Sequence, residues 1–504
     1  MPVFVGCDLG TMGTKAAVVD EEGRIAGEAF EEVPLRYPRP GWVEQDLLEI
    51  EASAHRTIRA ALAASRHSDE VAGVAFSGQM SGIGAIDDGF RPATHFDSWL
   101  DTRCEPYIRM MEEHADRIVE LSGCPPTYSH GPKILWWKHE RPEDWRRVAR
   151  FVVPGAFVAG RLCALAADRA FIDRTYVHFS NLAETERAAW SLELLDAFSV
   201  DAALLPRIVD PLEIVGEVSP AGAEATGIPA GTPVAAGAGD QAAASLGAGV
   251  VDAGQAFDSA GTASVFAMCV PTFAPDVRHR TLMATHSVLP GVYIALAFIN
   301  GGGLALRWFR DEIAGLSEAL DAYSRLDALA AEVEPGAGGL LWMPHVQGCV
   351  LPPRPHVRGG WFGLTSGHRL GHLFRAMLEG IAFEYAAWAD LASALGGAEL
   401  REARVLGGGA SSSLWNQIKA DVLGIDWVPT QRQECGVLGD ALIAAAATGR
   451  VSNLADAAKS WQGTGPVMRP DATRHERYRR FLEAYRELTG RAGPVFEVLA
   501  EAAE

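Results

Sequence analysis

The sequence predicts an α/β protein built from two similar halves that face each other across a central cleft. Short apolar strands alternate with amphipathic helices, which indicates sheets covered by helices. An apolar strand that runs into an acidic, Gly- and Thr-bearing hairpin occurs at residues 8–14 and again at 258–264, as expected for a duplicated unit. The chain has 504 residues, of which 48% are hydrophobic, so it can form more than one hydrophobic core.

The first half is predicted to begin with two strands that are joined by a tight turn. Residues 3–7 and 16–19 are short apolar runs, and the segment 8–14 between them turns the chain back. Residues 46–64 carry apolar side chains at helical spacing, and residues 71–76 predict a third strand. This order of elements is typical of a sheet with a helix packed on it.

The second half repeats this order. A strand at 233–236 leads into Gly237-Ala238-Gly239-Asp240 and a helix of small residues, and 256–268 predicts a strand, a turn and a strand. A further strand at 404–406 precedes Gly407-Gly408-Gly409, with a helix from about residue 411.

Small residues are dense between positions 244 and 252, which favours a domain boundary there. We therefore predict an N-terminal domain of residues 1–247 and a C-terminal domain of residues 248–504 that ends in a helix.

Charge and cysteine usage restrict the class of protein. The 44 basic and 64 acidic side chains give a net charge of −20, which argues against non-specific binding to nucleic acid or to an anionic membrane. The N-terminus has no basic segment followed by a long apolar run, as a targeting signal would need. The seven cysteines are scattered and form no C-x-x-C pair, which suits reduced thiols. We expect a cytoplasmic enzyme.

The two acidic hairpins are candidate phosphate-binding loops. In Asp8-Leu9-Gly10-Thr11-Met12-Gly13-Thr14-Lys15 two glycines let backbone N–H groups face an anion, and Asp8 could hold Mg²⁺. The segment 258–264 also combines an aspartate with glycine and hydroxyl side chains, and two facing loops could clamp one polyphosphate. Each loop by itself could equally be a plain hairpin.

Three interpretations are possible for the segment Gly237-Ala238-Gly239-Asp240-Gln241-Ala242. It satisfies the dinucleotide-binding pattern G-x-G-x-x-A, but a carboxylate after the second glycine would repel a pyrophosphate. If Asp240 instead faces a substrate hydroxyl, it is well placed to act as a general base. A purely structural strand-to-helix turn is the third interpretation.

Two triple glycines and one polar cluster complete the candidate site. Gly301-Gly302-Gly303 and Gly407-Gly408-Gly409 each follow a strand, where they allow either contact with a flat ring or phosphate, or close packing of helix on strand. Gln79-Met80-Ser81, with Trp99, Asp101 and Arg103, suits a polyhydroxylated ligand, although a solvated loop explains it too. His368 and His372 lie four residues apart with no evident third metal ligand.

Taken together, these motifs resemble the FGGY carbohydrate kinase family, within the actin/Hsp70/hexokinase-like superfamily. The most specific match is Gly359-Gly360-Trp361-Phe362-Gly363-Leu364 followed after seven residues by 372–379, and the resemblance extends from Asp8 to Gly436-Val437-Leu438-Gly439-Asp440-Ala441. It implies two duplicated ribonuclease H-like or actin-like ATPase domains that flank a cleft. The implied cofactors are ATP and Mg²⁺, and a homodimer is common in the family.

The resemblance also implies a role for each matching residue. Asp240 would be the base that takes a proton from the sugar hydroxyl, and Asp8 would place Mg²⁺ and the γ-phosphate. The implied ATP-binding residues are Gly10, Thr11, Gly13, Thr14, Lys15, Gly261, Thr262, Gly302, Gly407, Gly408, Gly409 and Ala410. The implied sugar-binding residues are Gln79, Met80, Ser81, Trp99, Asp101, Arg103, Asp240 and Gln241.

The acceptor is less well defined by the sequence. Ser77-Gly78-Gln79-Met80 looks most like a xylulokinase, but it continues with Ser81-Gly82 where that pattern has His-Gly, and Gly348-Cys349-Val350-Leu351-Pro352 stands where Gly-Glu-Arg-Thr-Pro is usual. We expect phosphorylation of a ketopentose such as D-xylulose, with ribulose, erythritol, glycerol or gluconate as alternative acceptors. Two other classes stay open, an Hsp70/actin-like ATPase with a protein partner and a nicotinamide-dependent oxidoreductase.

Overall fold

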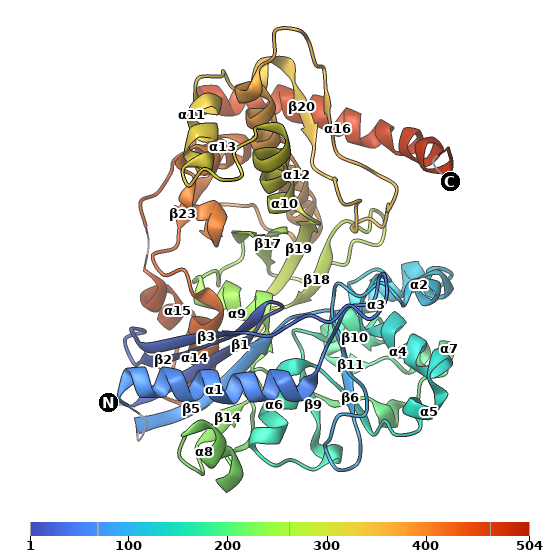
Figure 1. The fold of residues 1–504 in the computed structure, drawn as a ribbon, viewed down its shortest axis with the longest axis vertical. Coiled ribbons are helices and arrows are strands. Elements are labelled where there is room, and N and C mark those ends of the chain that lie inside the picture. The colour runs from blue at the N-terminus through green and yellow to red at the C-terminus, as the bar shows by residue number, and fades with distance from the viewer. Residues whose placement is uncertain (1, 68–69, 262, 464, 503–504) are drawn as a thin grey trace.

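Two large sheets, one in each half of the chain, organise the protein (Figure 1). The computed structural model describes residues 2–67, 70–261, 263–463 and 465–502. In the first sheet the strand order is β13-β14-β5-β1-β2-β3, with β15 paired to β5, and in the second sheet it is β18-β19-β17-β16-β22-β23.

The strands of the first sheet are β1 (Val3–Leu9), β2 (Gly13–Asp20), β3 (Ile25–Glu32), β5 (Val71–Gly78), β13 (Ile214–Glu217), β14 (Pro233–Ala235) and β15 (Ala238–Gly239). The strands of the second sheet are β16 (Gln255–Ala260), β17 (Ser264–Val270), β18 (Met283–His286), β19 (Tyr293–Ile299), β22 (Glu402–Leu406) and β23 (Asp426–Pro429). The short two-stranded pairs are formed by β4 (Glu44–Gln45), β6 (Gly84–Ile86), β7 (Phe96–Asp97), β8 (Arg150–Val152), β9 (Phe171–Asp173), β10 (Ala183–Glu184), β11 (Ala189–Trp190), β12 (Arg207–Val209), β20 (Leu341–Met343) and β21 (Gly360–Phe362).

Both sheets have the same pairing at their centre, which confirms the predicted duplication. In the first, β1 pairs antiparallel with β2 and parallel with β5. In the second, β16 pairs antiparallel with β17 and parallel with β22. The first antiparallel pair closes in a short hairpin at residues 10–12. In the second, Ala260 pairs with Ser264, and Thr262 between them lies outside the described residues.

The helices of the first half are α1 (Leu47–Ser65), α2 (Glu105–Glu112), α3 (Ala115–Ser122), α4 (His130–Glu140), α5 (Pro142–Trp145), α6 (Pro154–Leu162), α7 (Leu192–Ala197), α8 (Pro220–Thr226) and α9 (Asp240–Gly247). The helices of the second half are α10 (Gly302–Trp308), α11 (Ala322–Ala331), α12 (Leu370–Gly396), α13 (Ser413–Leu423), α14 (Cys435–Ala447), α15 (Leu454–Gln462) and α16 (Ala472–Glu501). The predicted helix 46–64 is α1, which Asp46 caps by accepting a hydrogen bond from the Leu48 N–H at 2.8 Å.

The helix predicted from about residue 411 begins two residues later. Residues Gly408–Ser411 form a single 3₁₀ turn, and Ser412 then caps α13 by accepting a hydrogen bond from the Trp415 N–H at 3.1 Å. A polar cap defines this start better than the apolar spacing does.

The part of the chain between β5 and β13 forms a subdomain that the alternation of strands and helices does not predict. It consists of α2–α5, α7 and short strand pairs, and it has a hydrophobic cluster of its own that includes Trp136, Trp137 and Phe151. Helix α6, in the same stretch of the chain, packs instead on β5 and α1. In Figure 1 this subdomain lies beside the first sheet and below β18.

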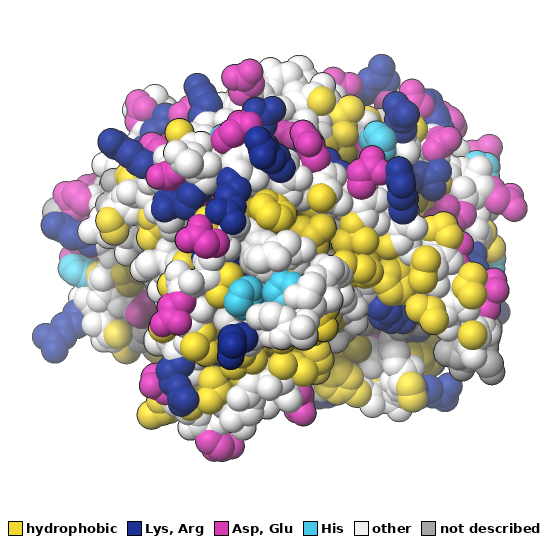
Figure 2. All heavy atoms as spheres, turned by 90° about the horizontal axis from the view of Figure 1, so that it is seen from above, with side chains coloured by type: hydrophobic (Ala, Val, Ile, Leu, Met, Phe, Trp, Pro, Cys, Tyr) yellow, Lys and Arg dark blue, Asp and Glu magenta, His cyan; other side chains and the backbone are white. Residues whose placement is uncertain are grey.

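Within the described residues, no helix is long and apolar enough to cross a membrane. Figure 2 views the molecule from the end that carries α11 and α16, and there charged side chains of both signs are interspersed with hydrophobic ones.

Helix α14 comes from the second half of the chain but packs on the first sheet, against β1, β5 and α9 (Figure 1). The contact is made by backbones, because a Cβ added at Gly439 would lie 1.9 Å from the Ala243 carbonyl oxygen, and one at Gly247 would lie 1.9 Å from that of Cys435. Gly6 of β1 is equally confined, with the Val437 carbonyl oxygen at 2.1 Å. Only glycine fits at these positions, so α9, α14 and β1 are held at fixed mutual distances.

We predict that Gly439→Ala lowers the free energy of unfolding by about 1–3 kcal/mol or more, since the new methyl group must push α14 away from α9. Chemical denaturation measures this change. Gly490→Ala is the matched control, because a Cβ there meets no atom within 4 Å and alanine favours the helix. Equal stability of the two variants would contradict the packing described here.

Candidate active site

A cavity of about 360 Å³ lies between the two halves and brings the two predicted hairpins together. The first half contributes Thr11, Trp99 and Asp240 to its wall, and the second half contributes Ser259 and Gly261. The remaining wall is mainly apolar. It includes Met80, Leu100, Phe179, Val265, Met283, Leu296, Phe298, Val350 and Leu351.

Three aspartates converge where β1, α9 and α14 meet. The Ser77 Oγ lies 2.8 Å from Asp440 Oδ2 and 3.3 Å from Asp8 Oδ1. A hydroxyl has one proton to donate, so Ser77 can satisfy both carboxyl groups at once only if one of them is protonated. Asp440 is fully buried, and burial together with the negative charge of Asp8 raises its pKa well above the usual value. The shorter contact is the hydrogen bond that the Ser77 hydroxyl donates to Asp440 Oδ2, and it holds Asp440 beside Asp8.

Asp8 lies at the end of β1, next to the first hairpin. Burial raises its pKa to about 6, against the opposing effects of the Ser77 hydrogen bond and the charge of Lys15. Lys15 itself forms an ion pair with Glu434, the residue that precedes α14. The cation predicted to bind phosphate is thus also tied to the segment that leads into α14.

Asp240 is the first residue of α9 and lies on the wall of the cavity. Burial and the charge of Asp8 raise its pKa to about 7, although hydrogen bonds with Gln241 oppose this. Its Oδ1 atom is shielded from solvent and has no hydrogen-bond partner among the described residues. A carboxyl group with this pKa and a free oxygen suits proton transfer near neutral pH.

A buried polar pair fixes the strand that carries Asp240. The Gly239 N–H donates to Thr175 Oγ1 at 2.8 Å, and the Thr175 hydroxyl donates to Asp173 Oδ1 at 2.5 Å. Met80 packs closely on Gly239, where a Cβ would lie 2.6 Å from the Met80 methyl carbon. These contacts leave the start of α9 little freedom to shift.

The residues predicted to bind sugar fall into three groups. Met80, Ser81, Trp99, Asp240 and Gln241 line the cavity.

Gln79 is buried beside the cavity and forms the second group. Its side-chain amide donates to Gln45 Oε1 at 2.7 Å, and Gln45 in turn donates to the Thr11 carbonyl oxygen at 3.2 Å. The Trp99 indole N–H donates to Thr11 Oγ1 at 2.8 Å, so Gln79 and Trp99 both support the first hairpin.

Asp101 and Arg103 form the third group and are not part of the cavity wall. Arg103 donates to Asp101 Oδ2 at 2.7 Å and to Glu44 Oε1 at 2.7 Å, and its guanidinium carbon lies 3.9 Å from the centroid of the Trp42 ring. Asp101 also accepts a hydrogen bond from the Val43 N–H at 2.6 Å. Both charges are therefore satisfied within the protein.

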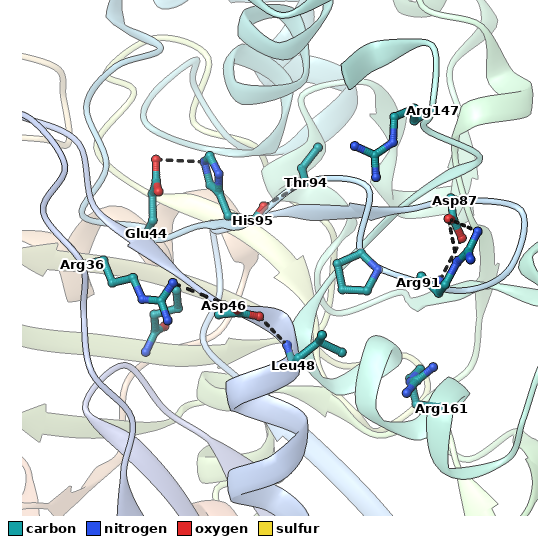
Figure 3. A pocket seen from close by; sticks show the side chains of 12 residues that line it. Arg36, Glu44, Asp46, Leu48, Asp87, Arg91, Thr94, His95, Arg147 and Arg161 are labelled. Carbon is teal, nitrogen blue, oxygen red and sulfur yellow. Dashed lines mark hydrogen bonds and ion pairs between the residues drawn. The ribbon is translucent and has the colours of Figure 1, made fainter. Parts of the chain in front are cut away.

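A larger cavity, of about 820 Å³, is lined by Glu44, His95 and other charged residues (Figure 3). Its charges are largely neutralised, since Arg91 pairs with Asp87 at 2.8 Å, and Glu44 lies 3.0 Å from the His95 ring. None of the residues predicted for ATP or sugar lines this cavity. The smaller cavity between the halves is the better candidate site.

Of the residues predicted to bind ATP, those of the second half that the structure describes gather at one end of the second sheet. Ser259 and Leu406 are neighbours across β16 and β22, which brings Gly407-Gly408-Gly409-Ala410 beside the second hairpin. A Cβ at Gly302 would lie 2.2 Å from Ser264 Oγ, so this glycine allows α10 to pack against the start of β17. Gly407 has φ +69, a backbone conformation that favours glycine.

Metal binding at this site would rest on few protein ligands. Among the described residues, no group of three or more His, Cys, Asp and Glu side chains could hold a metal ion. The His368 and His372 rings meet edge to face with centroids 5.4 Å apart, and among the described residues they gain no third ligand. Asp8 and Asp240 still fit Mg²⁺, which keeps several waters and takes one or two carboxylates together with phosphate oxygens.

Three positioning residues do not emerge from the sequence motifs. Asp173 and Thr175 carry no local signal, because their partner Gly239 is distant in sequence. Asp440 does carry one, since it is the sole charged side chain in the otherwise small and apolar α14. A buried charge on such a helix points to a functional contact.

Comparison with known proteins places the whole chain in one family. Two models of the FGGY family of carbohydrate kinases match it, the N-terminal domain at residues 3–247 and the C-terminal domain at residues 256–448. A xylulose kinase from Bacillus subtilis is 24% identical over 97% of each chain, and a glycerol kinase from Methylibium petroleiphilum is 31% identical over 97% of this chain and 99% of its own. The crystal structure of a xylulose kinase from Rhodospirillum rubrum superposes with a TM-score of 0.90 at 25% identity, covering 98% of this chain and 99% of that one. The protein belongs to the FGGY family of carbohydrate kinases.

Proposed function

We propose that this sugar kinase transfers the γ-phosphate of ATP to a hydroxyl of a ketopentose such as D-xylulose, with Asp240 as the general base. The observation that carries the proposal is the position of Asp240. Asp240 lines a cavity that joins the two hairpins, one of its carboxylate oxygens has no partner among the described residues, and its pKa is raised to about 7. A base of this strength takes a proton readily from a hydroxyl that is being phosphorylated.

The reaction requires one proton transfer and one exchange of P–O bonds. The sugar oxygen loses its proton to the Asp240 carboxylate and forms a bond to the γ-phosphorus, while the bond from that phosphorus to the β,γ-bridging oxygen breaks and ADP leaves. The protein contributes mainly position and charge to such a step. The hairpin at 10–12 would hold phosphate through backbone N–H groups, and Gly261 would do so from the facing sheet.

Mg²⁺ would be held by Asp8 and, through water, by Asp240. When bound, it neutralises part of the phosphate charge. The chain supplies a suitable place for it, because two half-buried carboxyl groups with raised pKa values concentrate negative charge at the end of β1.

The acceptor assignment rests on the shape and lining of the cavity. A volume of about 360 Å³ suits a small sugar or polyol, and the Trp99 indole and the Met80 side chain offer apolar surface for its carbon skeleton. Relatives named xylulose kinase and glycerol kinase both align over nearly the whole chain, so the two acceptors must be compared directly.

An acceptor panel tests the proposed function. We predict Mg-ATP-dependent ADP release with D-xylulose that exceeds release with L-xylulose, D-ribulose, L-ribulose, glycerol, erythritol and gluconate. Asp240→Ala should lower kcat by about 10²–10⁴ because the base is lost. Asp168→Ala, which changes an exposed aspartate outside the cavity, is the control and should keep full activity. A preferred acceptor other than D-xylulose would refute the acceptor assignment, and near wild-type turnover by Asp240→Ala would refute the base.

The pH dependence tests the base separately. Asp240 must be ionised to accept a proton, and its pKa is raised to about 7, so activity should be low at acid pH and rise as the pH passes through 7. Measuring kcat/KM between about pH 5.5 and about pH 9 should show this rising limb followed by a plateau. A kcat/KM that is constant from the lowest pH upward would mean that the pKa of Asp240 lies near the ordinary value for an aspartate.

A further inference from the structure

A second cavity, of about 580 Å³, lies behind the loop that forms one wall of the candidate active site. Leu351 lines both cavities, with Val350 on the active-site side and Cys349 and Arg354 on the other side. The loop is closed by hydrogen bonds between the Cys349 and Arg354 backbones, at 2.8 and 3.2 Å. A molecule in the second cavity would therefore touch the loop that shapes the acceptor site.

The floor of this cavity holds a buried histidine. His345 is 8% exposed, and its Nε2 lies 3.1 Å from Glu384 Oε1, which also accepts a hydrogen bond from the Tyr485 hydroxyl at 2.6 Å. The Nδ1 atom is shielded from solvent and makes no hydrogen bond of regular geometry with a described residue. Burial would lower the pKa of His345, but interactions with Cys349 and Glu384 outweigh it and raise the pKa to about 10.

An imidazole with this pKa is protonated at neutral pH and carries a hydrogen on both nitrogens. The group beside its Nδ1–H is the Cys349 sulfur, a weak acceptor that satisfies a buried charged donor poorly. An anionic ligand in the cavity would provide a stronger acceptor.

The charge of the cavity wall also favours an anionic ligand. Arg278 and Arg354 are exposed on it and form no ion pair with another residue that the structure describes. Arg486 is paired with Asp390, and Glu384 is the sole acidic side chain of the wall. In a chain of net charge −20 this is a local positive field, which concentrates small anions.

We propose that this cavity binds the phosphate group of a small metabolite, with oxygens that accept hydrogen bonds from His345 Nδ1 and from the guanidinium groups of Arg354 and Arg278. A phosphate offers three oxygens to three donors, and arginine matches its geometry. The ligand would fix the loop at residues 349–354 and so alter acceptor binding in the candidate active site, which the same loop lines. Binding itself does not depend on the function proposed above.

Cys349 provides a reporter at the site, because its half-exposed thiol lines the cavity. The experiment measures the rate at which iodoacetamide alkylates Cys349 in the full-length protein, by mass spectrometry of the peptide. Labelling is followed in inorganic phosphate, in glucose 6-phosphate and in chloride of equal ionic strength. We expect phosphate to slow labelling by about fivefold when the site is mostly occupied. Slower labelling at lower concentrations of glucose 6-phosphate would identify a phosphomonoester as the ligand, and equal potency would identify the free ion.

Variants separate this cavity from the phosphate hairpins of the active site. Arg354→Gln removes a charge from an exposed position and should abolish protection, whereas Arg491→Gln, on the same helix as Arg486 but outside the cavity wall, should retain it. His345→Gln, which keeps a donor for Glu384, should also abolish protection. Equal labelling in phosphate and chloride would overturn the proposal. So would protection that persists in both Arg354→Gln and His345→Gln, because phosphate would then be acting from elsewhere.

Discussion

The crowding of three carboxyl groups at one junction is the constraint on which the site depends. Asp8, Asp240 and Asp440 come from β1, α9 and α14, and the negative charge of Asp8 raises the pKa of both Asp240 and Asp440. Like charges this close in a protein interior cannot all be ionised. Burial and neighbouring negative charge raise the pKa of Asp440 well above its usual value, and they raise the pKa of Asp240 to about 7.

This arrangement needs backbones that touch. If α14 lay a methyl group farther from α9, Asp440 would lose its contact with Ser77, and the link to Asp8 would be broken. Gly439 and Gly247 permit the close approach, and the polar pair of Asp173 and Thr175 fixes the strand before α9 from the other side. Because α14 follows the second sheet in the chain yet packs on the first, it also joins the two halves at the site. Closure of the halves over substrates would pivot near this contact.

Local patterns in the sequence predict the duplicated core well. The strands β1, β2, β16 and β17 are short apolar runs bounded by glycine-rich turns, so their pattern is visible without tertiary information. The hairpins and Asp240 are also recognisable, because glycine and aspartate at a strand end carry a definite conformational and chemical meaning. The subdomain between β5 and β13 is missed, because its strands of two or three residues are stabilised by tertiary contacts rather than by periodicity.

The limits of prediction at the site follow from distance along the chain. Asp101 and Arg103 look like ligand-binding residues in sequence, yet their charges are satisfied by Glu44 and the Val43 N–H, more than fifty residues earlier. The roles of Ser77 and Asp440 depend on a hydrogen bond across 363 positions. No local pattern reveals such pairs, although a single charge on a helix of small apolar residues is a usable signal.

The most direct test of the crowded carboxyl groups is the stability of Asp240→Asn against that of the wild type at two pH values. In the folded wild type the pKa of Asp240 is raised to about 7 from an ordinary value of 3.8, so ionisation costs folding stability as the pH rises between these values. The asparagine variant does not lose this stability, because its side chain does not ionise. Its gain in the free energy of unfolding, measured by chemical denaturation, should be roughly 1–3 kcal/mol larger at pH 8 than at pH 5. An equal gain at both pH values would show that the carboxyl groups do not compete for charge, and would contradict the account of this site.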